Sequence, residues 1–283
     1  MELLTTVNYK VQKSSIKTLI MHLAPHKLSG KNVCSMATAG CAAACLNTAG
    51  RGKFTVVQNA RIKRTKMFFE ERERFFAQLH DEITRAQRKY GHIAVRLNGT
   101  SDITWEAYKV YEGQNIFEAL PSVIFYDYTK IAKRFFNPLP QNYHLTFSYS
   151  GEPEYYKGKA AEVAKNVLSL GYPVAVVFSS LPDSFLGYPV INGDETDERF
   201  LEGSVIVGLT AKGKAKHDNT GFVVREEGDK YLATARKSFA VIFVVISAGG
   251  IYISFEGSPT DGQIYTLFFT SVFWLSVGLY TAE

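Results

Sequence analysis

Three cysteines, Cys34, Cys41 and Cys45, lie in one short segment, and the rest of the 283-residue sequence contains none. Their spacing is C-x6-C-x3-C, and most residues between them are Ala, Gly or Ser. Small neighbours leave room for a bulky inorganic group close to the backbone. Three thiolates can hold three irons of a [4Fe–4S] cluster and leave the fourth iron open to another ligand. The segment therefore predicts a metal or iron–sulfur centre with these cysteines as ligands.

Zinc is the competing metal, and it requires a fourth protein ligand. His22 and His26 precede the cysteines, and His26 follows Pro25 in an expected loop. His22 lies in an apolar run, where it can be a buried core histidine, so His26 is the better candidate ligand. An odd number of cysteines and the absence of a secretory pattern at the N-terminus argue against disulfides and favour a reducing cytoplasm. Iron–sulfur and zinc both remain open.

Six short apolar runs are predicted to form the strands that position this segment. They are rich in β-branched and aromatic residues, which is typical of strands buried on both faces; they cover 16–23, 93–97, 123–126, 143–149, 174–178 and 205–209. Helices are expected over 55–90, where Gly91 supplies a stop, and over 154–171. Alternating strands and helices predict an α/β fold with a parallel sheet. Six units favour a partial (β/α)6 barrel, with a doubly wound sheet as the alternative.

Polar residues follow most of these runs, where a barrel carries its catalytic groups. We take as candidate cofactor-binding residues Asn98, Ser101, Asp102, Thr129, Lys130 and Ser148. No phosphate-binding P-loop or dinucleotide fingerprint is present. The sequence names no catalytic residue with a defined role.

The cysteine segment resembles that of phage-encoded radical-SAM-like three-cysteine barrel proteins of uncharacterised function, in which a C-x6-C-x2-C pattern follows the first strand. Gly99–Asp102 and Tyr128–Lys130 are similar to further segments of that group, and the likeness extends loosely over 16–224. It implies a partial barrel of radical-SAM type, a [4Fe–4S] cluster on the three cysteines, and Ser101 and Asp102 near the cofactor. It also implies S-adenosylmethionine at the open iron, which such enzymes cleave to a radical.

Charge is distributed unevenly. Residues 1–66 carry eleven Lys and Arg against one acid, Glu2, so this part is +10 and the remainder is −5. Such a basic region suggests an anionic partner, either nucleic acid or a nucleotide, although a solvated surface explains it equally well. A zinc-stabilised nucleic-acid-binding protein without catalysis is therefore the alternative function.

The C-terminal region contains two uncharged stretches of 17 and 19 residues, 239–255 and 264–282. These lengths approach what a helix needs to cross a membrane. They predict a helical transmembrane hairpin that anchors a cytoplasmic domain, 1–236, to the inner membrane, with basic residues on the cytoplasmic side. The domain boundary is placed at 236/237. The alternatives are a β-hairpin at the first stretch and a buried helix at the second. A membrane-tethered interaction protein without catalysis is a further possibility.

Overall fold

A computed structural model describes residues 1–5, 16–225, 241–247, 250–256, 264–269 and 275–280. The chain divides into two compact units, Met1–Val224 and Arg225–Glu283. The boundary precedes the predicted one by 12 residues (236 against 224), and residues 226–240 lie outside the described part.

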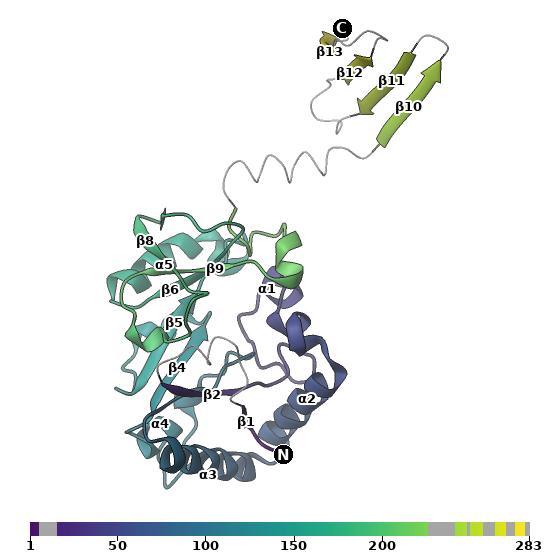
Figure 1. Ribbon diagram of the computed structural model, residues 1–283. Helices are drawn as coiled ribbons and strands as arrows, with labels where there is room; N and C mark the ends of the chain where they lie inside the picture. Colours follow the sequence, from purple (N-terminus) through teal and green to yellow (C-terminus); the bar gives the residue numbers. More distant parts are fainter. Residues whose placement is uncertain (6–15, 226–240, 248–249, 257–263, 270–274, 281–283) are drawn as a thin grey trace. The chain divides into compact units, whose positions relative to one another are not determined.

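The first unit is built on a nine-stranded sheet in the order β1-β2-β3-β4-β5-β6-β9-β8-β7 (Figure 1). All six predicted runs form strands, and these pair in parallel with their neighbours in chain order; they are β2 (Lys17–Met21), β3 (Ile93–Arg96), β4 (Ile124–Thr129), β5 (Tyr143–Ser148), β6 (Val174–Phe178) and β9 (Ile206–Thr210). The six predicted strands keep their chain order, unlike those of a doubly wound sheet, and the order turns back only at one edge, over β9, β8 and β7. The sheet is therefore mostly parallel and open.

Three short strands extend this sheet at its two edges. The strand β1 (Leu4–Thr5) pairs antiparallel with β2, and β7 (Ser184–Phe185) with β8 (Tyr188–Asn192). Since β8 also pairs in parallel with β9, the added strands lengthen the sheet without closing it.

The predicted helix over 55–90 is two helices, α2 (Thr55–Glu70) and α3 (Arg72–Tyr90), separated at Glu71 by a non-helical backbone (φ −131°, ψ 51°). The break allows aromatic side chains of both helices to pack on one buried indole. Phe68 from α2 lies 5.3 Å from Trp105, and Phe76 from α3 lies 6.0 Å from it, between ring centroids. As predicted, α3 ends at Gly91, whose φ of +74° favours glycine.

The second predicted helix is shorter than expected. Only α5 (Ala160–Ser169) is helical, because Tyr156 and Lys157 have positive φ values and Tyr155–Gly158 form a tight turn. The hydroxyls of Tyr155 and Tyr156 both donate to the Lys130 carbonyl, at 3.0 and 2.7 Å. These bonds hold the turn against the end of β4. The remaining helices, α1 (Ala39–Ala43) and α4 (Ile116–Ala119), are single turns.

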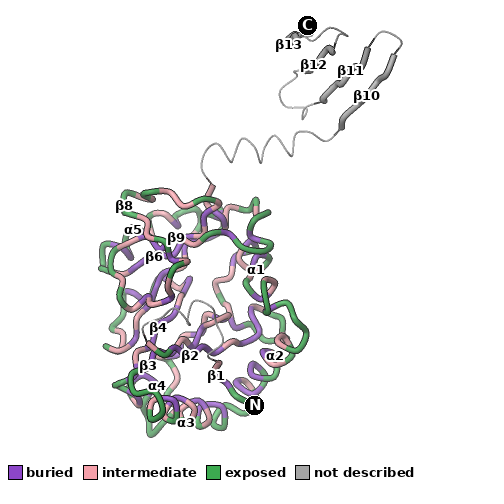
Figure 2. Tube along the Cα trace, viewed as in Figure 1, coloured by how far each residue is buried: buried purple, intermediate pink, exposed green. Residues whose placement is uncertain are grey.

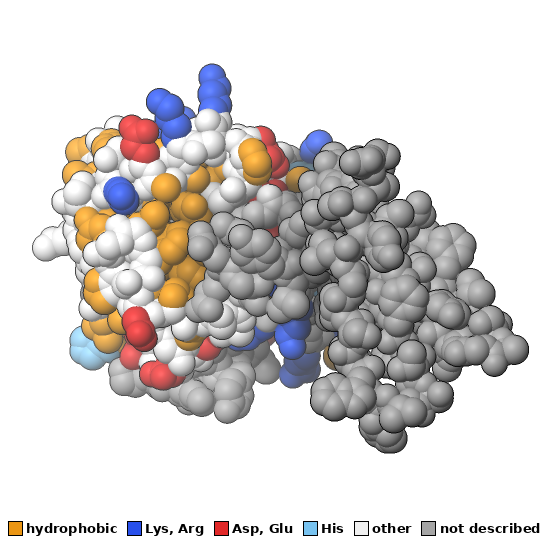
Figure 3. Space-filling model, turned by 90° about the horizontal axis from the view of Figure 1, so that it is seen from above, with side chains coloured by type: hydrophobic (Ala, Val, Ile, Leu, Met, Phe, Trp, Pro, Cys, Tyr) orange, Lys and Arg blue, Asp and Glu red, His pale blue; other side chains and the backbone are white. Residues whose placement is uncertain are grey.

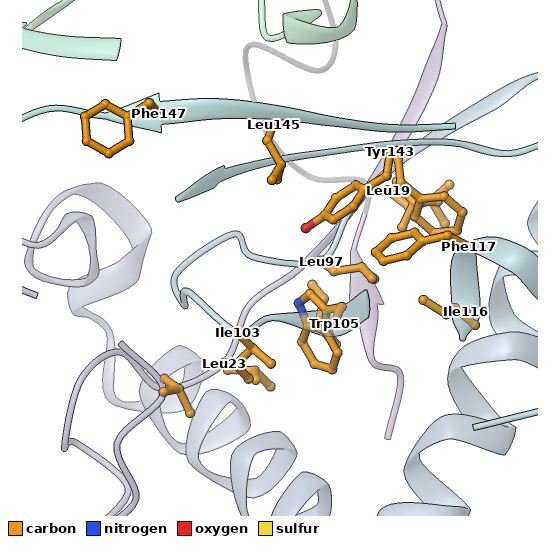
Figure 4. Packing of buried hydrophobic residues seen from close by; sticks show 14 of the residues in the cluster. Leu19, Leu23, Leu97, Ile103, Trp105, Ile116, Phe117, Tyr143, Leu145 and Phe147 are labelled. Carbon is orange, nitrogen blue, oxygen red and sulfur yellow. The ribbon is translucent and has the colours of Figure 1, made fainter. Parts of the chain in front are cut away.

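The two faces of the sheet differ in character, because successive side chains of a strand point to opposite sides. One face carries the hydrophobic core, in which Leu19, Leu145 and Phe147 lie with Trp105 and Phe117 (Figure 4). Figure 2 shows buried residues along these strands. The other face carries polar groups: Arg96, Tyr126, Tyr128 and Thr146. There Asp197 pairs with Arg96 at 3.2 Å and accepts from the Tyr126 hydroxyl at 3.0 Å.

The described residues of 239–282 do not form the predicted helical hairpin. The described residues form four antiparallel strands, β10 (Val241–Ser247), β11 (Gly250–Glu256), β12 (Ile264–Phe269) and β13 (Leu275–Tyr280). The alternative of a β-hairpin at the first stretch is the arrangement observed, in keeping with its β-branched and aromatic content. No helix in the described part of the chain is both long and apolar enough to cross a membrane. The anchor and its inner-membrane location stay predictions.

Candidate metal and cofactor site

The cysteine segment follows β2 and contacts loops that come after three other strands. The Asp102 amide donates to the Val33 carbonyl at 2.8 Å, and Cys34 forms a parallel bridge with Asp102, after β3. The Gly40 amide donates to Glu152, after β5, at 2.6 Å. Ala44 packs with residues that follow β9, among them Ala211. The cysteines are therefore held at the carboxyl ends of the parallel strands, the usual place for a site in this class of fold.

The three thiols are partly buried, and burial is the main reason why the pKa of each is raised, to about 12 for Cys34. Cys41 and Cys45 lie near enough to Cys34 to raise its pKa further. The Cys34 sulfur accepts from the His26 amide at 3.4 Å. Neutral thiols are expected in the metal-free chain, and a metal binds them by displacing their protons. Among the described residues, no three His, Cys, Asp or Glu side chains are arranged as a ready ligand set.

Lys130 is a buried cation beside these thiols. Its ammonium group donates to the carbonyls of Ser148 (3.3 Å) and Tyr149 (3.4 Å). It lies 4.8 Å from the ring centre of Tyr155. Burial lowers the pKa of Lys130, whereas nearby Cys41, Asp102 and Glu152 raise it. A positive charge at this position offsets negative charge that develops on Cys41.

Asp102 connects the cysteine segment to the end of β4. One of its oxygens, Oδ2, accepts from the Lys130 amide at 2.8 Å, while Oδ1 lies 3.6 Å from Arg134 Nη1 and has no hydrogen bond. Burial raises the pKa of Asp102, against the lowering effect of Lys130, Thr129 and Arg134. Asp102 is thus held between the Lys130 amide and the Arg134 guanidinium.

Asn98 and Ser101 hold the loop after β3 in place. Asn98 Oδ1 accepts from the Ser101 hydroxyl, the Ile103 amide and the Trp105 indole, at 2.8 to 3.0 Å. Its amide nitrogen donates to the Ile103 carbonyl. The side chain of Asn98 is therefore fully engaged in shaping the loop that presents Asp102.

Thr129 and Ser148 also lie at this edge. The Thr129 hydroxyl accepts from the Ile131 amide at 3.0 Å, and Ser148 offers its carbonyl to Lys130. The structure brings all six predicted cofactor-binding residues to the carboxyl ends of β3, β4 and β5. Asp102 and Lys130 supply the charged groups there.

Comparison with known families adds one decisive match: the family model described as gene product 88 matches residues 2–226. The chain belongs to the gene product 88 family. This membership indicates a phage-type protein, as the sequence predicted, and it carries no radical-SAM assignment. The match ends within two residues of the first unit's end at Val224, and none of β10–β13 falls within it. No curated protein and no solved structure matches the chain.

Three important side chains of this gene product 88 chain were absent from the predicted site. Glu152 is 1% exposed; one oxygen accepts from Gly40 and the other from Ser150 at 2.9 Å. Arg61 is also buried and lies near Cys45. Tyr155 covers Lys130. The sequence signal for Glu152 was its position in a polar loop after a strand. Arg61 gave no comparable signal, because it lies in a basic helical segment that is equally typical of a solvated surface.

The described lysines and arginines of the basic region, residues 1–66, fall into two sets. Arg61 and Arg64 are buried, whereas seven other cations among the described residues are exposed: Lys17, Lys27, Lys31, Arg51, Lys53, Lys63 and Lys66. On the face seen in Figure 3, hydrophobic side chains lie together, with acidic and basic side chains around them. Nucleic-acid binding through this region stays a prediction.

A pH-dependent stability is expected from Asp127, which accepts from the Asn98 amide at 2.6 Å and from the Tyr143 hydroxyl at 2.9 Å. Complete burial outweighs these bonds and raises its pKa to about 7. The folded chain then retains a proton that the unfolded chain releases near pH 4. This contribution to the unfolding free energy is full below about pH 4 and is lost as the pH rises through about 7.

Urea denaturation at pH 4, 5.5 and 7 should therefore show the stability of the wild type falling relative to Asp127→Asn across this range. The substituted amide retains an acceptor for the Asn98 amide and cannot ionise. If the stabilities of the two proteins changed in parallel with pH, the raised pKa of Asp127 would be contradicted.

Proposed function

We propose that the first unit is an iron–sulfur enzyme of radical-SAM type, with its cluster on Cys34, Cys41 and Cys45. The observation that carries the proposal is the position of the cysteine segment. It lies at the carboxyl ends of parallel strands, against buried Lys130 and partly buried Asp102. The open sheet with strands in chain order supports it, as does the resemblance of the cysteine segment.

The donor set fits an open cluster by its chemistry. Three thiols match the three protein-bound irons of a [4Fe–4S] cluster with one free iron. A structural zinc site needs a fourth ligand. His26 contacts Cys34 through its backbone amide. The donor chemistry therefore favours iron–sulfur over zinc.

When bound, such a cluster would supply reductive cleavage of S-adenosylmethionine. The residues of the chain itself supply charge, shielding and hydrogen bonds at this site. Lys130 offsets the negative charge of the thiolates, and Tyr155 and Phe222, 4.8 and 5.4 Å from its ammonium group, shield that charge from water. Asp102, fixed by the Lys130 amide and Arg134, orients the loop beside the cysteines.

The test is the metal content of the full chain purified without oxygen. We expect about four irons and matching sulfide per chain. A triple variant with Ser at the three cysteines should lose both, whereas Ser35→Ala, an exposed residue of the same segment, should retain them. Unchanged iron in the triple variant would refute the ligand assignment. One zinc and no iron would favour the zinc-stabilised binding protein instead.

A further inference from the structure

Two basic segments that lie far apart in the sequence form one surface of the first unit. One contains the short helix η3 (Gly50–Lys53), and the other contains η8 (Gly213–His217). A Cβ atom at Gly213 would lie 3.1 Å from the Cβ atom of Ala49, so the two segments are in direct contact. Figure 1 shows η8, in green, beside α1, the helix that precedes η3. We call the exposed part of residues 46–54 and 211–217 the η3–η8 surface.

Small residues make this close contact possible and leave the cations in water. In both segments an exposed cation stands on either side of a buried small residue, as in Arg51–Gly52–Lys53 and Lys214–Ala215–Lys216. Ala215 packs with Ala44 and Ala211 in a small hydrophobic cluster. Because the small residues take part in the packing, the long basic side chains between them remain at the surface.

Much of this positive charge has no carboxylate beside it. Neither segment contains an acidic residue. Lys212 is neutralised by Asp194, whose oxygen lies 2.7 Å from its ammonium group. In the part of the chain that the structure describes, no carboxylate forms an ion pair with Arg51, Lys53 or Lys214. Three positive charges on one surface therefore attract a partner that carries several negative charges.

Two large apolar side chains are exposed next to these cations. The ring of Phe54 is 53% exposed and the side chain of Leu46 is 60% exposed. The Phe54 amide donates to the Arg51 carbonyl at 3.2 Å, so the ring and this guanidinium group belong to one turn. Proteins that bind single-stranded nucleic acid without sequence preference combine cations for the phosphates with aromatic rings on which bases stack. The η3–η8 surface has both components.

We infer that the η3–η8 surface binds single-stranded nucleic acid, with the phosphates on Arg51, Lys53 and Lys214 and a base stacked on Phe54. The inference goes beyond the proposed function, because binding at this surface requires no metal. Cys45 directly precedes the first of the two segments. A strand bound here therefore lies at the edge of the candidate metal site.

The experiment is fluorescence anisotropy of a labelled strand of about 20 thymidine nucleotides, titrated with the full chain at several salt concentrations. We expect saturable binding with a logarithmic salt slope of about −2, since each of three phosphate contacts contributes about −0.7. Arg51→Gln and Lys214→Gln should each weaken binding about threefold and reduce the slope by about 0.7. Phe54→Ala should weaken binding about tenfold without a change of slope. Lys165→Gln alters an exposed lysine of α5 and should leave the affinity within about twofold of wild type.

Absence of binding to the wild type, or wild-type affinity in Lys214→Gln, would overturn the inference. Tighter binding of a duplex of the same length would also overturn it, since a paired base cannot stack on Phe54. Binding to phosphatidylserine vesicles without binding to the oligonucleotide would overturn it and assign the surface to a membrane.

The triple Cys→Ser variant separates this inference from the proposed function. It should lose its iron and still bind the oligonucleotide with wild-type affinity. Loss of oligonucleotide binding in this variant would tie the binding to the metal centre and overturn the inference. A wild type that contains iron but binds no oligonucleotide would support the proposed function and overturn the inference alone.

Discussion

Replacement of Glu152 by Ala should lower the unfolding free energy by about 3 kcal/mol and reduce iron content by more than half. Both carboxylate oxygens are buried acceptors, one for the Gly40 amide and one for the Ser150 hydroxyl. Hydrogen bonds to charged groups contribute about 1.5–3 kcal/mol each, and a buried amide left without a partner adds a further penalty. Since Gly40 precedes Cys41, loss of this bond should also release the helix that carries the second cysteine. Urea denaturation and iron analysis measure the two effects.

Two matched variants separate the effect of the Glu152 carboxylate from that of its hydrogen-bonding geometry. Glu152→Gln retains an acceptor for Gly40 and a polar group for Ser150, so we expect a loss of about 1 kcal/mol and near-normal iron. Glu154→Ala changes an exposed side chain two residues away and should alter neither quantity. If Glu152→Ala binds iron as the wild type does, Glu152 does not position the cysteine helix.

The strands were predictable from sequence because their signal is local. Runs such as 174–178 are apolar and β-branched throughout, as buried parallel strands require. The cysteines and the charged residues Asp102 and Lys130 were predictable for a related reason. Each follows a strand, and parallel strands bring their carboxyl ends to one edge.

Other features depend on contacts between distant residues. Nothing near Glu152 in the sequence indicates that it binds Gly40, 112 residues away. Asn98 has a side chain of a type that often binds ligands. Its Oδ1 atom, however, already accepts hydrogen bonds from Ser101, Ile103 and Trp105. The stretch 239–255 is uncharged and long, which suits a membrane helix and a pair of strands alike; only strand pairing distinguishes them.

The loop after β3 should depend on Trp105, and Trp105→Ala is expected to cost about 4 kcal/mol. The indole is fully buried, stacks 6.3 Å from Phe75 and contacts Phe68 edge-on at 5.3 Å. Its N–H also donates to Asn98 at 3.0 Å. Removal of the ring therefore creates a cavity in the core and takes away a donor from the residue that shapes the Asp102 loop. Urea denaturation measures the loss.

Trp105→Phe distinguishes the two contributions, since it fills most of the cavity and removes only the N–H donor. We expect a cost of about 1.5 kcal/mol and faster amide hydrogen exchange at Ile103, whose amide shares the Asn98 acceptor. Phe136→Ala removes an aromatic ring that is 59% exposed and should change stability by less than about 0.5 kcal/mol. A Phe variant with wild-type exchange at Ile103 would show that packing alone fixes Trp105. In that case the loop that presents Asp102 would be shaped by Asn98 without help from the indole.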